Sequence, residues 1–502
     1  MKNAYFGSRP MQGNRRGAAS APVAGSVATV AGFAPSVHYH PHSAAMMNFS
    51  STPAVAGDWV ALVQDRMTLA SLTGNSSSDA PLLAVDALER KYLNFRSGAY
   101  MLIANALASL NSQAITVILV GRPHKCRAAN FFYPRWRSDG TTANSARAGA
   151  MVLALPTGGT ACFLASGPGT SFSSAAVNKE KFVPGSQLQV MGMCSRTTAN
   201  GGMRYGVNGD ISTFSAAVQQ TALTGMMGGV VGATPAAAGA VTQVTTTGFD
   251  LYEMMVYSGT LTDAQFDAAM AAATANWAIP AITRQLVLEG DSITDGVGDV
   301  QSDESLSAVL TRPGAEMVAG DCRVINLATS GNMVSHLVTR RDGTISMFDQ
   351  LLGSGEPARN LVAVQIGRNH WPSQTGAQAY AELVPLLNTT TTGYLQRGWS
   401  VAAVVNIAPS AALIARCNEQ RALMLSSLLT DTLSGPGQSF EGRVSLLRLD
   451  LAGVGGQTRF EDSADATNLT YYQNDTTHPS AAGTAAMASG GDNGAYGYGA
   501  LM

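Results

Sequence analysis

The sequence predicts a multidomain protein in which an all-β sandwich precedes a three-layer α/β sandwich with a parallel five-stranded sheet. Three observations lead to this fold class. The chain has 502 residues, enough for about three domains at roughly 150 residues each. Residues 58–280 consist of short strands separated by Gly, Asn, Ser and Pro turns. Residues 284–502 instead alternate hydrophobic strands with helical stretches.

Residues 1–57 are the first predicted unit, an extended N-terminal arm. The segment is rich in Ala, Gly, Ser and Pro and has neither a helical nor a strand period. It contains His38, His40 and His42, whose alternate spacing would put three imidazoles on one side of an extended segment. A three-fold assembly could close a metal site that way. A surface cluster of histidines is the simpler interpretation.

The second predicted unit is the all-β sandwich. Its clearest strands cover 92–103, 115–120, 187–194 and 249–257. The last of these is apolar on both faces and leads into a turn at 258–259. Thr262 and Gln265 then fit a capping box at the start of an amphipathic helix. The unit therefore ends in a strand, a cap and a helix.

That ending, FDLYEMMVYSGTLTDAQFDAAMAAATANW, resembles the last strand and closing helix of concanavalin A-like, laminin-G-type jelly-roll domains. The resemblance rests on one end of the unit and implies a jelly roll over 58–280. Domains of this kind bind glycans, or they serve as spacers and oligomer contacts. The sequence does not favour the glycan-binding role over the structural one. It contains no Asp/Asn cluster that would bind a calcium ion.

The third predicted unit is the α/β domain that follows the linker at 278–281. Its predicted strands are 285–288, 323–327, 361–366, 400–407 and 444–449, with the longest helical stretches at 377–395 and 411–433. Five strands joined by crossovers make a doubly wound sheet. In such a sheet, reactive groups gather beyond the carboxyl ends of the strands.

Charge and cysteine content exclude several function classes. Lys and Arg number 31 against 33 Asp and Glu, so no basic field gathers nucleic acid or anionic lipid. The five cysteines form no CxxC pair, which argues against a disulfide framework and a zinc site. We expect no metal and no cofactor. No apolar run approaches the roughly eighteen residues that a bilayer requires, and no signal peptide is recognisable.

Reactive side chains follow the ends of the predicted strands. Ser292 lies on a tight turn after the first strand, which would expose its hydroxyl and free its amide to donate. Gly331 follows the second strand, and Asn369, an amide donor, follows the third. Asp475 precedes His478 by three residues. That spacing lets the carboxylate fix the tautomer of the ring, so that the far nitrogen can accept a proton from serine.

These segments resemble the four blocks of the SGNH (GDSL-type) hydrolases, in the family's order. The matching residues are Gly290-Asp291-Ser292, Gly331, Gly367 with Asn369, and Asp475 with His478. A lone GDS is a weak signal, but four blocks in order, each after a strand, are strong together. The resemblance covers about 284–502.

The resemblance implies a role for each matching position. Ser292 would be the nucleophile, His478 the general base and then acid, and Asp475 the group that orients the imidazole. The backbone amides of Ser292 and Gly331 and the side chain of Asn369 would form the oxyanion hole. The implied reaction is attack on an ester carbonyl, formation of an acyl-enzyme and hydrolysis by water.

The third block departs from the family pattern, which usually has an acidic residue after the asparagine. His370 stands at that position and is followed by Trp371. We expect both to contact the substrate, with His370 as a second candidate for the base. The departure leaves the local support of Asn369 in question.

The predicted function is a serine esterase that removes O-acetyl groups from a polysaccharide, because GDSIT followed by Asp-Gly resembles the carbohydrate-esterase side of the family. The partner would then be an acylated polysaccharide or another ester. Two alternatives stay open. One is a structural or receptor-binding particle protein with a degenerate hydrolase domain, and the other is a lipase-like acylhydrolase.

The expected location is a virion surface or the extracellular space. A chain with few lysines, much Gly, Ala and Thr, and an N-terminal arm resembles bacteriophage tail or fibre proteins that modify host polysaccharide. The resemblance implies contacts with other virion proteins through residues 1–57. A homotrimer with intertwined arms would favour this interpretation.

Overall fold

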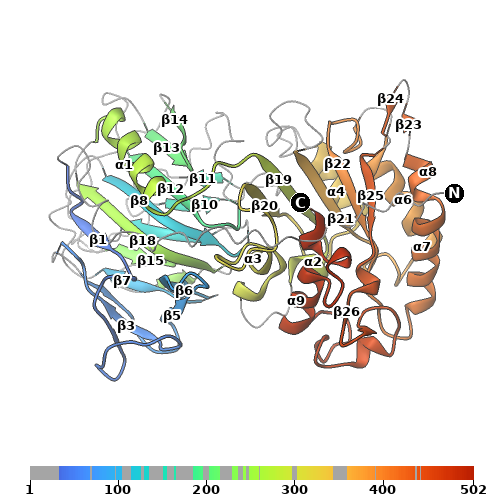
Figure 1. Cartoon of the computed structure of the whole chain (residues 1–502), viewed down its shortest axis with the longest axis horizontal. Helices are drawn as coiled ribbons and strands as arrows, with labels where there is room; N and C mark the ends of the chain where they lie inside the picture. The colour runs from blue at the N-terminus through green and yellow to red at the C-terminus, as the bar shows by residue number, and fades with distance from the viewer. Residues whose placement is uncertain are drawn as a thin grey trace.

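The structure is a computed structural model, and Figure 1 shows its two halves side by side. It describes residues 33–67, 71–96, 98–103, 115–125, 129–134, 151–154, 163–165, 185–195, 203–214, 229–235, 241–244, 248–258, 261–296, 302–342, 359–389, 392–432, 434–435, 438–440 and 442–501. We call residues 33–280 the β half and residues 284–501 the α/β half.

Two antiparallel sheets, each of eight strands among the described residues, build the β half. The first contains β1 (Val37–Tyr39), β5 (Leu82–Val85), β6 (Lys91–Phe95), β8 (Ile115–Pro123), β12 (Gln189–Ser195), β13 (Met203–Val207), β14 (Asp210–Phe214) and β18 (Phe249–Ser258). The second contains β2 (Met46–Asn48), β3 (Val60–Val63), β4 (Leu72–Thr73), β7 (Met101–Ile103), β9 (Ala129–Pro134), β10 (Met151–Ala154), β11 (Phe163–Ala165) and β15 (Gly229–Val231).

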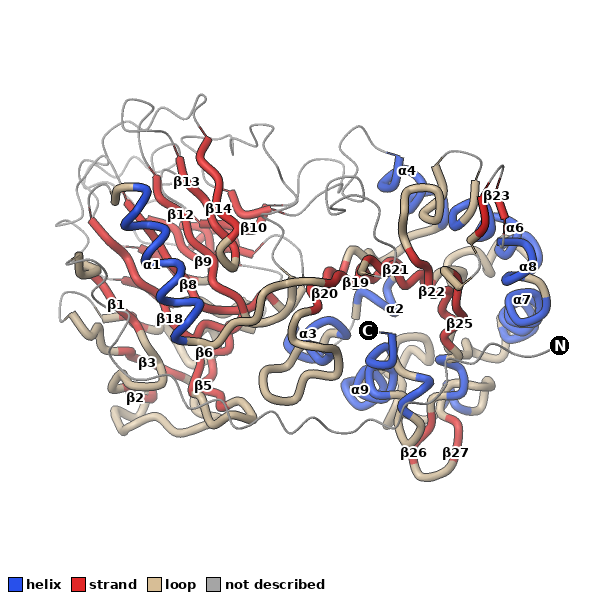
Figure 2. Tube along the Cα trace, turned by 45° about the horizontal axis from the view of Figure 1, so that its top comes forward, coloured by secondary structure: helices blue, strands red, loops and turns tan. Residues whose placement is uncertain are grey.

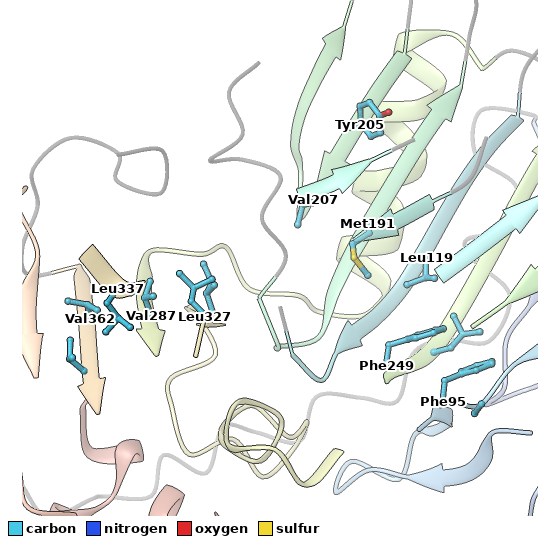
Figure 3. Packing of buried hydrophobic residues seen from close by; sticks show 14 of the residues in the cluster. Phe95, Leu119, Met191, Tyr205, Val207, Phe249, Val287, Leu327, Leu337 and Val362 are labelled. Carbon is cyan, nitrogen blue, oxygen red and sulfur yellow. The ribbon is translucent and has the colours of Figure 1, made fainter. Parts of the chain in front are cut away.

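Alternation along β8 shows how this half packs. Val117 and Leu119 join a core that also contains residues of the second sheet. Ile118 and Val120 point to the other face, against helix α1 (Asp263–Asn276). Figure 3 shows Leu119 in the shared core with Phe95 and Phe249, whose stacked rings have centroids 4.7 Å apart. The sheets therefore enclose one core, while a jelly-roll connectivity stays a prediction.

The predicted ending of the β half is present. β18 covers the predicted closing strand, and α1 follows with Thr262 as its N-cap. Thr262 Oγ1 accepts a hydrogen bond from the Gln265 amide, and the Gln265 side chain accepts one from the Thr262 amide. This capping box satisfies two amides that the first helical turn leaves unpaired.

Part of the predicted arm lies within the sheets. β1 pairs with β18, and β2 pairs with β3, whereas residues 1–32 lie outside the described residues. His38 and His40 are each 1% exposed, so the surface-cluster interpretation is wrong for these two. His38 Nε2 lies 2.7 Å from Glu253 Oε1, and the His40 ring packs against Trp277. Burial against partners on β18 and beyond α1 explains the difference.

The α/β half contains a parallel sheet with strand order β20-β19-β21-β22-β25 among the described residues. Its strands are β19 (Arg284–Gly290), β20 (Cys322–Asn326), β21 (Asn360–Gln365), β22 (Ser400–Val404) and β25 (Val444–Leu447). Each corresponds to one of the five strands expected from the sequence. The parallel sheet is therefore confirmed.

Helices cover both faces of this sheet (Figure 2). Val287 of β19 shares a cluster with residues of α4 (Val334–Asp342) and α6 (Gly376–Leu387). Its neighbours in β19, Leu286 and Leu288, point to the opposite face and pack with α3 (Leu306–Leu310) and α9 (Ala481–Ser489). The arrangement has three layers, helix, sheet and helix.

The helices differ from the prediction at their ends. The helix expected over 377–395 ends at Leu387, because Thr389 Oγ1 accepts hydrogen bonds from the amides of Thr392 and Gly393 and turns the chain. The helix expected over 411–433 is two helices, α7 (Ile414–Ser426) and α8 (Leu428–Thr432).

Buried polar contacts join the two halves. Arg122 Nε lies 2.5 Å from Asp250 Oδ2 within the β half, and its Nη1 donates to the carbonyl of Ala308 in α3. The carbonyl of His124 accepts hydrogen bonds from the hydroxyls of Ser307 and Ser305, at 2.7 and 3.2 Å. The end of β8 is thus fixed against α3. Among the described residues, no helix is both long and apolar enough to span a bilayer.

Candidate active site

The candidate site lies at the carboxyl edge of the parallel sheet. In the order β20-β19-β21-β22-β25, the chain runs from β19 to one side and later to the other, so the switch point lies between β19 and β21. Ligands of open α/β sheets bind at such a point. Ser292 follows β19 directly, and Asn369 follows β21.

A tight turn presents Ser292. Asp291 is the N-cap of the short helix α2 (Ser292–Asp295), and its Oδ1 accepts a hydrogen bond from the Ile293 amide at 3.1 Å. Burial raises the pKa of Asp291 to about 6. A Cβ at Gly290 would lie 2.7 Å from the Gln365 carbonyl, so the turn requires glycine there. Ser292 begins the helix, where backbone amides lack helical partners.

The structure brings Ser292, His478 and Asp475 together. Ser292 Oγ lies 2.8 Å from His478 Nε2, and His478 Nδ1 lies 2.5 Å from Asp475 Oδ2. Because a carboxylate can only accept, the proton of the neutral ring resides on Nδ1. Nε2 then carries the lone pair that can accept the serine proton.

The Asp475–His478 loop orders its own carboxylate. Asp475 Oδ1 accepts hydrogen bonds from the amides of Thr477 and His478, at 2.9 and 3.0 Å, and Thr476 adopts a left-handed φ of 52°. Burial raises the pKa of Asp475, but the hydrogen bonds from His478 and Thr477 outweigh it, and the pKa is lowered from its ordinary value. Asp475 therefore stays ionised beside the imidazole.

The loops that carry the predicted oxyanion donors are joined at the end of β19. The Gly290 carbonyl accepts hydrogen bonds from the Thr329 amide at 3.2 Å and from Asn332 Nδ2 at 2.9 Å. Asn369 Nδ2 in turn donates to the Asn332 carbonyl at 2.8 Å. Gly331, with φ of 80°, has open space where a Cβ would be. The first three sequence blocks therefore meet at one edge.

Several supporting residues were not singled out from the sequence. Arg368 Nη2 donates to Thr477 Oγ1 at 2.7 Å and so holds the loop that carries the base. Asn332 links the second block to the first and third. Each lies next to a residue of the four sequence blocks in the chain. A polar side chain adjacent to a block residue could therefore have indicated a supporting role.

Glu289 and Asp295, on either side of the nucleophile turn, are both buried. Glu289 forms a two-point ion pair with Arg340 of α4, with Nε–Oε1 at 3.0 Å and Nη2–Oε2 at 2.5 Å. Burial raises the pKa of Glu289, while Arg340 opposes the rise. Asp295 Oδ2 accepts a hydrogen bond from the Ser330 amide at 3.1 Å. Asp295 therefore supports the loop after β20, and Glu289 holds the helix that follows this loop.

His370 and Trp371, the predicted substrate contacts, lie inside the domain at 0% and 1% exposed. His370 Nε2 is 3.2 Å from both the Val334 amide and Glu382 Oε2, and burial lowers the pKa of His370. Trp371 Nε1 donates to Gln420. Because both side chains are committed to contacts with helices, we do not carry them into the proposed substrate site.

The arrangement is suited to acyl transfer. It places a serine hydroxyl against a base, a carboxylate behind that base, and backbone and amide donors on the same edge. Within the part of the chain that the structure describes, no group of three or more His, Cys, Asp or Glu residues is arranged to hold a metal ion.

Comparisons with known proteins give similarity at the level of structure. No family model matches the chain, and no curated protein matches it. A lipolytic G-D-S-L family protein from Veillonella parvula is 15% identical, with 41% of this chain and 95% of that chain covered at a TM-score of 0.30. The psychrotrophic esterase EstA from Pseudoalteromonas sp. is 16% identical, with 40% of this chain and 90% of that chain covered at a TM-score of 0.28. A Bacillus subtilis protein is 12% identical, with 79% of this chain and 81% of that chain covered at a TM-score of 0.29. The function is therefore argued from the geometry of the site.

Proposed function

We propose that this chain is a serine esterase, a carboxylic ester hydrolase of the SGNH type. One observation carries the proposal: Ser292 Oγ lies 2.8 Å from His478 Nε2, and Asp475 holds the other nitrogen of the same ring. The ionised carboxylate fixes the tautomer and stabilises the imidazolium that forms when serine loses its proton.

In the proposed reaction, Ser292 Oγ forms a bond to the ester carbonyl carbon while its proton passes to His478 Nε2. The carbonyl becomes an oxyanion, which the amides of Ser292 and Gly331 and the side chain of Asn369 would receive. The carbon–oxygen bond to the alcohol then breaks, and His478 gives its proton to the departing oxygen. Water repeats the sequence on the acyl-enzyme and restores Ser292.

We further propose that the acyl group is acetyl and that its carrier is a polysaccharide at a virion surface or in the extracellular space. Two features support this choice. The run GDSITDG resembles the carbohydrate-esterase side of the SGNH hydrolases. The β half packs directly beside the half that bears Ser292, where a polymeric substrate could reach both (Figure 1).

The esterase proposal is tested by hydrolysis of p-nitrophenyl acetate. We expect Ser292→Ala to lower kcat by at least about 10⁴-fold, because the hydroxyl is the nucleophile. Ser426→Ala, which changes an exposed serine on α7, is the matched control and should keep the wild-type rate. An unchanged rate in a folded Ser292→Ala protein would refute the proposal.

The substrate proposal is tested separately, by measuring acetate released from O-acetylated polysaccharides and the rate on esters of increasing chain length. We expect acetate release and a preference for short acyl groups. A preference for long chains would identify a lipase-like acylhydrolase instead. A folded protein inactive on every ester would support the structural or receptor-binding alternative.

A further inference from the structure

Lys125 extends from the β half toward the nucleophile's helix. It follows His124, whose carbonyl is held by the hydroxyls of Ser305 and Ser307, and whose ring lies 2.9 Å from Asp250 Oδ1. The backbone before Lys125 is therefore fixed against the α/β half. The side chain of Lys125 therefore starts from backbone that contacts the α/β half, although Lys125 itself belongs to the β half.

The ammonium of Lys125 reaches the end of helix α2. Its Nζ donates to the Gly296 carbonyl at 3.4 Å and lies 3.6 Å from Asp295 Oδ1. Gly296 is the left-handed C-cap of the helix that begins with Ser292. The Lys125 side chain is only 15% exposed and that of Asp295 only 2%, so water screens this pair weakly.

The same carboxylate holds the loop that carries an oxyanion donor. While Oδ1 of Asp295 faces Lys125, Oδ2 accepts the Ser330 amide at 3.1 Å. Ser330 immediately precedes Gly331. A buried carboxylate without a nearby cation is strongly disfavoured, and the ammonium offsets that cost. Lys125 therefore holds the Asp295 carboxylate in place, and Asp295 holds the Ser330–Gly331 backbone in place.

We propose that Lys125 is a positioning residue for the esterase reaction, through which the β half fixes the Gly331 oxyanion donor. The inference rests on the proposed esterase function. It makes the β half part of the catalytic unit, because Lys125, whose Nζ lies 3.6 Å from Asp295 Oδ1, belongs to the β half. The donor contributes most in the transition state, so its displacement affects kcat more than KM.

The experiment compares Lys125→Met with Lys91→Met in the full chain, because Lys91 is an exposed lysine of the same half. With p-nitrophenyl acetate, we expect Lys125→Met to lower kcat by roughly ten- to a hundredfold and to leave KM within about twofold. Lys125→Arg, which keeps the charge, should restore most of the rate. Lys91→Met should match the wild type.

A double-mutant cycle with Asp295→Asn supplies the decisive readout. We expect Lys125→Met to cost little in the Asp295→Asn background, since the carboxylate it serves is then gone. A wild-type kcat in folded Lys125→Met, or additive losses in the cycle, would overturn the inference while leaving the esterase proposal intact. Should Lys125→Met fail to fold, an unchanged kcat in Asp295→Asn would overturn it equally. Inactive wild type would instead refute the esterase proposal itself.

Discussion

Arg368 acts on a single loop from a neighbouring strand end. The loop 475–478 contains a left-handed threonine, and Asp475 Oδ1 accepts hydrogen bonds from the loop's own amides at Thr477 and His478. Arg368 Nη2 adds a contact from beyond β21, by donating to Thr477 Oγ1 at 2.7 Å. Since His478 must keep its Nε2 within reach of Ser292, restraint of this loop bears on the rate of proton transfer.

We predict that Arg368→Met lowers kcat by roughly 10- to 150-fold, because a hydrogen bond from a charged group contributes about 1.5–3 kcal/mol, at about 1.4 kcal/mol per tenfold. Thr477→Val removes the same bond from the other side and should have a similar effect. Kinetics of both single variants and the double variant check this. If the double variant loses as much as the two single losses multiplied, the two side chains act independently and the prediction is wrong.

At the scale of residues, the sequence located the side chains that meet at the sheet edge, because each follows a strand whose carboxyl end faces the same way. Ser292, His478, Asp475 and Asn369 were found by this rule together with the family resemblance. This rule could not identify Lys125, because Lys125 lies in the β half and no local sequence pattern connects it to Asp295. The burial of His370 was equally invisible, since it depends on how α4 and α6 pack.

Among the elements, β1 is anchored by buried polar groups as well as by its pairing with β18. His38 and Trp277 both contact the Glu253 carboxylate, with Trp277 Nε1 donating at 2.6 Å. The His40 ring lies beside this group, 5.5 Å between centroids from Trp277. Burial lowers the pKa of His40 to about 4, although Glu253 opposes the shift. The neutral ring is thus the form that fits the folded strand.

We predict that this histidine makes stability depend on pH. The unfolded chain binds a proton at His40 near its ordinary pKa of 6.5, whereas the folded chain does so only near 4. The contribution is therefore constant above about pH 6.5, falls as the pH drops toward 4, and levels off below, with a total loss of about 3 kcal/mol.

Chemical denaturation of the wild type and His40→Gln at several pH values from 7.5 to 4 measures the effect. Carboxylates titrate in both proteins, so the difference between the two stability curves isolates His40. A difference that does not change with pH would contradict the prediction.

Elements with a strong pattern were predicted well, and those set by distant contacts were not. β18 and the Thr262 cap were evident from an apolar run followed by capping residues. The strand at Val37–Tyr39 was missed, because Ala, Gly, Ser and Pro around it give no period and its pairing partner lies more than two hundred residues away. The early end of α6 was missed because Thr389 competes for amides beyond the helix.

On the scale of the whole molecule, the join between the halves depends on a buried charge. Arg122 and Asp250 have side chains 1% and 0% exposed, and Arg122 also reaches the backbone of α3. A charge left alone in such surroundings costs far more than a pair contributes. An arrangement of the two halves that left Arg122 buried without these partners would therefore be strongly disfavoured.

We predict that Asp250→Asn lowers the free energy of unfolding by about 3–5 kcal/mol, because Arg122 loses its counter-charge while it stays buried. Asp267→Asn breaks the Arg204–Asp267 pair, whose carboxylate is 44% exposed, and should cost less than about 1 kcal/mol. Denaturant unfolding of both variants checks this. If both variants lost the same free energy of unfolding, the buried pair would contribute no more to stability than the exposed one, and the prediction would be wrong.

The distance along the chain between nucleophile and base has a consequence during synthesis. His478 is 186 residues beyond Ser292. At about 5–20 residues per second, a ribosome needs roughly 10–40 s to go from one to the other. Throughout that interval a nascent chain carries the serine without its proton acceptor. In the proposed reaction, ester cleavage would therefore begin only after His478 has been synthesised, and shorter nascent chains would carry an inactive serine.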